Sequence, residues 1–406
     1  MRLAIVVANV AALALLAVPS ACRSRNDAHT TSSASASMRE PTPEPPLPRL
    51  VATDGAIAVN NMDAQIESLE KRSAERSSRR GLVEMLLSRG QFLGRIADYE
   101  RAATIAEALV REDPKDAGGY ESRASTLATF HRFDDALADL AEAERRGRKA
   151  DDLAPARVAI FVATGRIDDA AALRPRDEAT MQTMELASAG FLRGEMGDVA
   201  NAARLVDLAR SKYVDVSPFP LAWMDAQEGT LLERNGKRER AKAHYARAIA
   251  LLPLYARAAS HLAALSRPAD AVALLEPIAA SSDDPEVLAQ LSDALRRSGR
   301  AAEADERRGA AIARYEELLA RHPAAFADHA ASMWLGIGRD PARALPLARA
   351  NLAVRHTSDA YELVLTAALA AKQDDGICPV AREAAALKYA TDGLRALAAP
   401  IVKRCA

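Results

Sequence analysis

The stretch "EGTLLERNGKRERAKAHYARAIALLP" occupies residues 228–253 and sets small and apolar residues at regular intervals among charged ones. The Asn-Gly step at 235–236 indicates the end of a helix, because glycine tolerates the left-handed conformation found there. Beyond this step, Ala241, Tyr245 and Ala248 recur at intervals of four and three residues and therefore share one helix face. The final proline prevents this second helix from continuing. The stretch predicts two helices joined by a tight turn.

The same pattern returns along the chain with a period of 34 residues. A small residue of the second helix and an apolar residue of the first helix both keep this interval. These positions are Ala102, Ala136 and Ala170 for the second helix, and Leu93, Leu127 and Phe161 for the first. Self-similarity at a fixed period is the signature of a repeat array, in which each unit buries its apolar face against its neighbours.

On these residues the chain resembles the tetratricopeptide repeat (TPR) family. Residues 228–253 match its pattern of small, aromatic or leucine, and proline positions, and residues 86–114 match it again. The aromatic residue usual early in the first helix is mostly missing, so the repeats are degenerate. The resemblance covers roughly residues 60–375. It implies an all-α fold, a right-handed superhelical solenoid of antiparallel helix pairs, whose first helices line a concave surface that binds a protein or peptide.

The expected organisation follows from this repeat. An N-terminal capping helix is expected within residues 51–82, about eight TPR-like helix-turn-helix units within 83–375, and C-terminal capping helices within 376–406. Caps are needed because the outer face of a terminal repeat has no neighbour.

The first residues predict export. Arg2 precedes an apolar stretch over residues 3–18, as in a secretory signal peptide. This stretch is shorter than the roughly 20 residues that span a membrane. With Cys22 after small residues, the segment resembles a bacterial lipoprotein signal, which implies removal of residues 1–21 and lipidation of Cys22. Pro19 departs from the leucine usual there, and ordinary cleavage near residues 20–21 is the alternative.

Residues 22–50 are rich in serine and then in proline. Such a composition has too little apolar mass to offset the entropy of ordering, so a disordered tether is predicted. With a lipid on Cys22, the protein would lie in the cell envelope, at the periplasmic side or the surface of a bacterial membrane.

Two further cysteines, Cys378 and Cys405, lie in the last segment. In an oxidising compartment an even pair predicts a disulfide. The bridge would stabilise the C-terminal cap by about 3.5 kcal/mol in the loop-entropy model. The alternative is two buried free thiols.

Motifs for catalysis are missing from the sequence. It has no phosphate-binding loop, nucleophile elbow, H-E-x-x-H or C-x-x-C motif, and we expect no catalytic residue, cofactor or metal. His322 and His329 are seven residues apart, about 10 Å along a helix, which is too far for a shared ion. With 54 basic and 55 acidic residues, the net charge of −1 predicts no bulk attraction to nucleic acid or anionic membrane.

By register with the repeat, a mixed polar set of side chains is expected to face the concave surface. Trp223, on the same helices, either fills the core or anchors a partner. The predicted partner-binding residues are Gln91, Glu121, Ser125, Trp223, Gln227, Thr230, Gln290 and Asp293.

We therefore expect an exported, lipid-anchored scaffold without enzymatic activity that mediates protein–protein interactions in the bacterial cell envelope. Two alternatives remain open at this point. One is an enzyme or assembly factor that holds a peptide or glycan substrate in the solenoid groove, and the other is a purely structural spacer.

Overall fold

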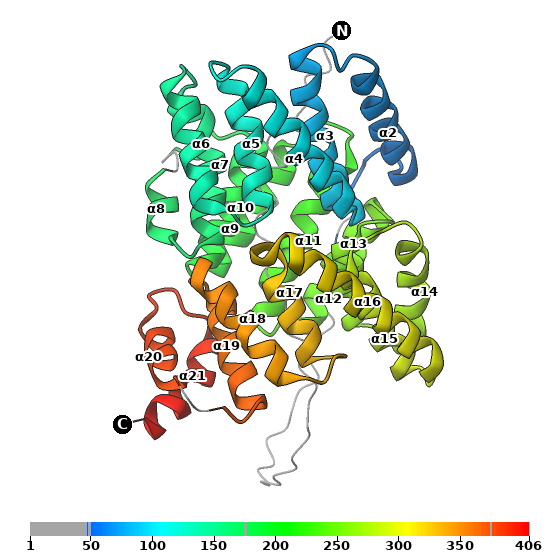
Figure 1. Cartoon of the computed structure of the whole chain (residues 1–406), viewed down its shortest axis with the longest axis vertical. Helices are drawn as coiled ribbons and strands as arrows, with labels where there is room; N and C mark the ends of the chain where they lie inside the picture. The colour runs from blue at the N-terminus through cyan, green and yellow to red at the C-terminus, as the bar shows by residue number, and fades with distance from the viewer. Residues whose placement is uncertain (1–46, 48–49, 174–176, 374–375, 406) are drawn as a thin grey trace.

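The computed structural model describes residues 47, 50–173, 177–373 and 376–405. The predicted signal peptide, Cys22 and nearly all of the predicted tether lie outside these residues. Within the described residues all regular structure is helical, with 20 helices and no strand, which confirms the predicted fold class (Figure 1). In this part of the chain no helix is both long and apolar enough to cross a membrane.

The helices, labelled as in Figure 1, are α2 (Gly55–Lys71), α3 (Arg76–Leu93), α4 (Ile96–Glu112), α5 (Ala117–Thr129), α6 (Phe133–Arg145), α7 (Ala150–Ala163), α8 (Ile167–Ala172), α9 (Thr183–Glu195), α10 (Val199–Lys212), α11 (Pro218–Arg234), α12 (Arg238–Leu251), α13 (Ala256–Ala264), α14 (Pro268–Ala279), α15 (Pro285–Arg297), α16 (Ala301–Arg321), α17 (Pro323–Leu335), α18 (Pro341–Val354), α19 (Ser358–Ala370), α20 (Ile377–Ala386) and α21 (Asp392–Arg404).

Successive helices from α3 to α18 pack as antiparallel pairs, so the fold is a TPR-like helical-repeat array (Figure 1). Glycine on the first helix brings the two members of a pair close together. A Cβ atom on Gly229 would lie 2.6 Å from the Tyr245 ring, and one on Gly90 would lie 2.5 Å from the Tyr99 ring. The aromatic ring of the second helix thus occupies the space that a larger residue on the first helix would need.

The quoted stretch folds as its sequence predicts. Helix α11 ends at Arg234 and α12 begins at Arg238, with Gly236 between them at a φ of 71°. The first unit differs from the expectation at its start. Its first helix, α3, begins at Arg76, before the expected boundary at 83, and the helix before it, α2, ends at Lys71.

Units far apart in the sequence also lie against one another. We call the turn inside a helix pair a corner, and the connection between pairs a junction. The corners at 94–97 and 130–131 contact the junctions at 282–283 and 322–324. The Ile96 N–H donates to the Asp283 carboxylate at 2.5 Å across 187 residues, and the His131 ring lies 3.1 Å from the Ala324 carbonyl across 193 residues.

A third corner, at 163–165, meets the junction at 355–356. There the His356 N–H donates to the Thr164 carbonyl at 3.2 Å, and the Arg355 guanidinium donates to the Ala163 carbonyl at 3.0 Å. Three successive corners therefore stack on three successive junctions about 190 residues later, as neighbouring turns of a superhelix do. We call this row of contacts the seam. In Figure 1 it lies between helices α3–α8 and helices α14–α21, which are coloured yellow-green to red. We call helices α3–α8 the first turn and helices α14–α21 the second turn.

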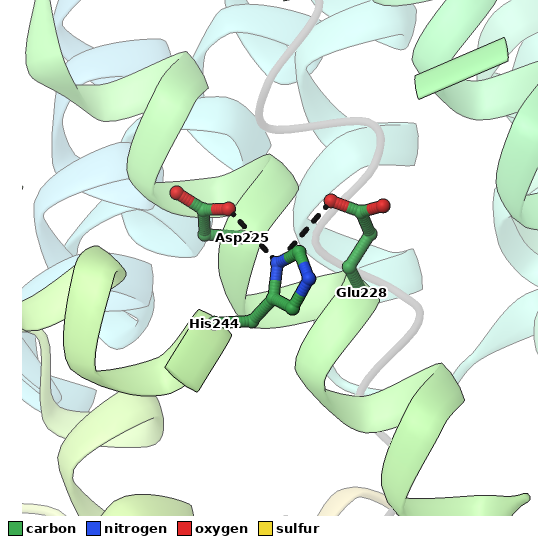
Figure 2. A group of neighbouring side chains, drawn as sticks. All are labelled: Asp225, Glu228 and His244. Carbon is green, nitrogen blue, oxygen red and sulfur yellow. Dashed lines mark hydrogen bonds and ion pairs between the residues drawn. The ribbon is translucent and has the colours of Figure 1, made fainter. Parts of the chain in front are cut away.

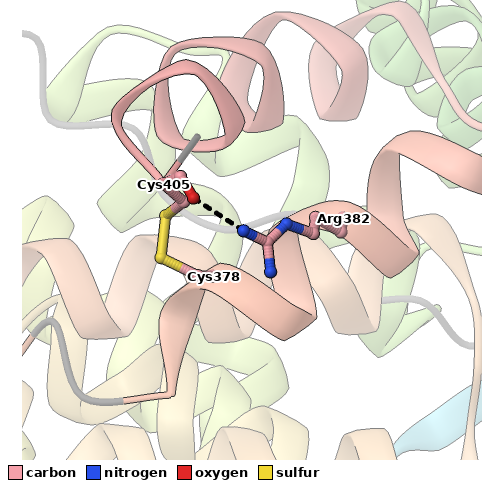
Figure 3. The surroundings of a disulfide bond; sticks show 3 residues. All are labelled: Cys378, Arg382 and Cys405. Atoms are coloured by element: carbon pink, nitrogen blue, oxygen red, sulfur yellow. Dashed lines mark hydrogen bonds between the residues drawn. A yellow bond between two sulfur atoms is a disulfide. The ribbon is translucent and has the colours of Figure 1, made fainter.

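The C-terminal helices close the array. Cys378 on α20 and Cys405 after α21 form a disulfide, with their Cα atoms 5.8 Å apart (Figure 3). The Arg382 guanidinium donates to the Cys405 carbonyl at 2.6 Å and supports the same contact. Leu394 and Ile401 are buried in the core cluster of the second turn. The bridge thus ties the last helix to the one before it.

Candidate functional site

The predicted partner-binding residues fall into two groups in the structure. Five of them, on α3, α5 and α15, are half-buried and remain in part accessible. Their accessible polar groups pair locally: Glu121 lies 2.7 Å from Arg148, and Asp293 lies 2.7 Å from Arg297. The five residues are Gln91, Glu121, Ser125, Gln290 and Asp293.

The other three, Trp223, Gln227 and Thr230, are buried on α11. The Trp223 side chain is 0% exposed and packs edge-on against Phe191, with ring centroids 5.1 Å apart. Phe92 on α3 packs against Phe219 at the start of α11, at a centroid distance of 5.0 Å. We therefore place these three residues in the core rather than on a surface that a partner can reach, and Trp223 fills the core.

Helix α11 also carries a buried cluster of ionisable groups (Figure 2). Asp225 and Glu228 are one helical turn apart, so their carboxylates project from the same side of α11. His244 comes from α12, and its Nδ1 lies 3.2 Å from the Asp225 carboxylate and 3.4 Å from that of Glu228. All three residues are buried.

Two arginines complete this cluster. Arg210 on α10 bridges the carboxylates of Asp225, at 2.8 Å, and Glu228, while Arg247 on α12 donates to Asp225 at 2.8 Å. Burial raises the pKa of Asp225, but hydrogen bonds from His244 and Arg247 outweigh burial and leave the pKa below its usual value. Burial dominates at Glu228 and raises its pKa. The five residues form a closed network of hydrogen bonds and ion pairs.

The capacity of this cluster for a metal ion can be judged from its donors. Asp225, Glu228 and His244 each offer a ligand atom, all within 4.8 Å of one another, and no other group of three such residues occurs in the described ranges. However, the guanidinium of Arg210 already donates to both carboxylates. A metal ion would have to displace this buried cation and would then lie beside it. The arrangement favours a structural ion network, and we assign no metal to it.

A second cluster lies at the seam. His329 on α17 contacts Glu286 on α15 at 2.5 Å, and the neighbouring Asp328 pairs with Arg355 at 2.8 Å. Burial lowers the pKa of His329, but the charges of Asp328 and Glu286 outweigh burial and raise it to about 9. On the first-turn side, burial and the charge of Arg355 lower the pKa of His131 to about 4. At neutral pH the seam thus holds a half-buried, cationic His329 and a buried, neutral His131.

The two histidines whose spacing argues against a shared ion, His322 and His329, have separate partners. His322 stacks on Phe130, with centroids 4.0 Å apart, and contacts Glu100 at 3.0 Å. His329 contacts Glu286 instead. His322 thus contacts the first turn, whereas His329 pairs within the second turn, on α15.

Comparisons with known proteins find similar chains only among solved structures. No protein-family model matches the chain, and no curated protein matches it. A chain of the APC/C hetero-tetramer Cut9–Hcn1 is 14% identical over 76% of this chain and 59% of its own length, with a TM-score of 0.38. Yeast Tom70 is 12% identical over 86% of this chain and 94% of its own length, with a TM-score of 0.35. The TPR domain of P58(IPK) is 17% identical over 81% and 99%, with a TM-score of 0.23. This chain therefore spans about three-fifths of the Cut9–Hcn1 chain.

Proposed function

We propose that the protein is a non-enzymatic scaffold that binds a protein or peptide and is exported to the bacterial cell envelope, where a lipid on Cys22 anchors it. The observation that carries the binding proposal is the placement of polar side chains on first helices of separate units. Glu121 on α5 and Asp293 on α15 keep 35% and 42% of their side chains exposed. Accessible polar groups on separate units of a helical array are suited to bind an extended or helical partner.

The buried network on α11 supports a scaffold over an enzyme. Its carboxylates and histidine are enclosed by two guanidinium groups, so a substrate does not reach them without opening the core. Because Trp223, Gln227 and Thr230 are buried, we limit the proposed binding surface to the accessible first helices α3, α5 and α15. The spacer alternative requires that no partner binds this surface.

Crosslinking in the native envelope tests the binding surface. We expect Glu121→Arg and Asp293→Arg each to reduce capture of the same partner, because each reverses a charge on the accessible face. Glu306→Arg is the matched control, since Glu306 is an exposed residue on the second helix α16. Equal capture by all three variants would rule out the first-helix face as the binding surface. If the unmodified chain captures no specific partner, the result would favour a purely structural spacer.

Membrane fractionation tests the anchor separately. Cys22→Ala leaves the chain exported but removes the lipid attachment site, so we expect the protein to move from the membrane fraction to the soluble fraction of the envelope. Retention in the membrane fraction at the original level would contradict lipidation of Cys22.

A further inference from the structure

Exposed apolar side chains gather at one place in the array. Six large apolar side chains are markedly exposed among the described residues, and four of them fall on two short segments beside α2 and α10. We call these four the aliphatic patch: Val51, Ile57, Val214 and Val216, with exposures of 88%, 53%, 95% and 57%. Scattered apolar residues are ordinary on protein surfaces, whereas a group of them marks an interaction site.

The backbone beneath the aliphatic patch is held in place. The Thr53 N–H donates to the Val216 carbonyl at 2.7 Å and joins the two segments. Between the exposed residues, Leu50, Ala52 and Tyr213 pack against the main core cluster. Inward side chains thus flank the exposed ones: Leu50 and Ala52 flank Val51, and Tyr213 precedes Val214. The outward side chains are fixed by the fold and do not belong to a loose loop.

The two carboxylates within the aliphatic patch are turned to the backbone. Asp54 accepts from the N–H groups of Ala56 and Ile57, at 2.9 and 3.2 Å, and so caps α2. Asp215 accepts from the N–H groups of Val216 and Ser217, at 2.6 and 3.2 Å. Backbone amides at a helix or turn terminus offset part of the negative charge. The outward surface is thus dominated by aliphatic groups.

The position of the aliphatic patch in the chain points to its occupant. Only 28 residues separate Cys22 from Val51. As the coil that their composition predicts, they would hold the patch about 30 Å from a lipid on Cys22. So short a tether would keep the effective concentration of the patch at the membrane surface high, and this would strengthen a weak apolar contact. The net charge of −1 gives the whole chain no electrostatic attraction to anionic lipid, so apolar contact must supply the docking.

We propose that the aliphatic patch docks on the phospholipid bilayer that holds the Cys22 lipid, so that the α2 end of the array faces the membrane. This inference rests on the proposed lipid anchor. Aliphatic side chains on a fixed surface enter the boundary between headgroups and acyl chains and are stabilised there by burial of apolar area. The array would then extend from the membrane in one orientation, with its first-helix face open to a partner.

A vesicle experiment tests the docking without natural lipidation. The processed chain that begins at Cys22 has one free thiol when Cys378 and Cys405 are bridged. This thiol is coupled to a maleimide phosphatidylethanolamine in phosphatidylcholine vesicles that contain brominated lipid. The variant Val214→Trp places an indole on the aliphatic patch, and the native Trp223 and Trp334 are buried and serve as background. We expect bromine to quench most of the added emission.

The matched control is Leu369→Trp, because Leu369 is a 38% exposed apolar residue on α19, in the second turn. Its emission should be unchanged by brominated lipid. Val51→Ser with Val216→Ser in the Val214→Trp chain should abolish quenching, with an unchanged circular dichroism spectrum. Absence of quenching at position 214, or equal quenching at 369, would overturn the proposal. So would a dimer of the untethered chain that the same serines dissociate.

Failure of the anchor and failure of the docking remain distinguishable. In the vesicles the tether is chemical, so the quenching result reports on the aliphatic patch alone. The mass of the N-terminal residue of the protein purified from cells reports on natural lipidation alone. A quenched Val214→Trp chain together with an unlipidated native protein would retain the docking surface and refute the anchor.

Discussion

The Asp283 carboxylate caps the N-terminus of α4 by accepting the N–H of Ile96 at 2.5 Å, across 187 residues of sequence. The second oxygen accepts the N–H of Ala97 at 3.1 Å. Helix α4 has no side-chain cap of its own, since Arg95 stands at its N-cap position. A side chain of the second turn therefore satisfies orphan N–H groups of the first turn, and helix capping becomes a contact between turns.

Removal of this cap is expected to weaken both the helix and the seam. We predict that Asp283→Ala lowers the free energy of unfolding by about 1 kcal/mol, the usual cost of a lost N-cap. Asp198→Ala is the control, because Asp198 caps α10 within its own unit. Amide hydrogen exchange should quicken at Ile96 and Ala97 only in Asp283→Ala. Unchanged exchange there would show that the capping contact does not hold in solution.

Gly165 is expected to be required for the third contact of the seam. It has a φ of 80°, and a Cβ atom on it would lie 2.3 Å from the His356 carbonyl oxygen. Gly299 has nearly the same φ, 81°, and an added Cβ would meet nothing within 4 Å. Gly299→Ala should therefore cost about 1–2 kcal/mol for the left-handed conformation alone. Gly165→Ala should cost more in urea unfolding, and equal costs would contradict the close approach of the two turns.

The helix pairs could be predicted from the sequence because their determinants are local. Gly229 and Tyr245 lie in one unit and meet in the structure as their spacing predicts. The seam could not be predicted in this way. It depends on the small rotation that each unit adds to the next, and this rotation accumulates over about 190 residues before Ile96 meets Asp283.

The sequence nevertheless carries a trace of the seam. Two of the three corners within it present apolar residues, Ile96 and Phe130, both of which are buried. The corner between α15 and α16 lies outside it and presents exposed Gly299 and Arg300. The burial of Trp223 has a similar local signal, because α11 begins with an almost continuous apolar run. The position of α11 in the repeat predicted that it faces an open groove. A helix that is apolar on several sides is instead expected to be buried on several sides.

The raised pKa of His329 predicts that the fold loses stability in mild alkali. Its pKa in the folded chain, about 9, is above the usual value of 6.5, because Asp328, Glu286 and Asp284 surround it. A raised histidine pKa contributes stability that is complete below about pH 6.5 and is lost as pH rises through 9. We expect the free energy of unfolding to fall by on the order of 3 kcal/mol over this range.

A pH series from 6.5 to 9.5 checks this expectation by urea unfolding. The variant His329→Gln should flatten the dependence, because it removes the titrating group and retains hydrogen-bonding capacity. His356→Gln is the control, since the side chain of His356 is exposed. An equally steep loss of stability in His329→Gln would assign the effect to other groups.

The buried network on α11 predicts that the stability of the fold depends strongly on its arginines. We expect Arg210→Met to cost about 3–5 kcal/mol, because it leaves Asp225 and Glu228 buried without their shared cation. Arg204→Met on the same helix removes an exposed pair with Glu178 and should cost about 1 kcal/mol or less. Zinc or a chelator should leave the melting temperature of the unmodified chain unchanged. A zinc-induced rise that His244→Ala abolishes would instead establish a metal site.

The disulfide predicts where the array loses stability first under reducing conditions. Cys378 and Cys405 are 27 residues apart, and a loop of this size is worth about 3.5 kcal/mol in the loop-entropy model. Because terminal repeats have only one neighbour, we expect the loss in Cys378→Ser with Cys405→Ser to fall on α20 and α21, as faster hydrogen exchange there. The first turn should keep its protection, and Cys22→Ser should match the unmodified chain. Uniform loss of protection along the chain would mean that the bridge supports the whole superhelix, and that the two turns unfold as one cooperative unit.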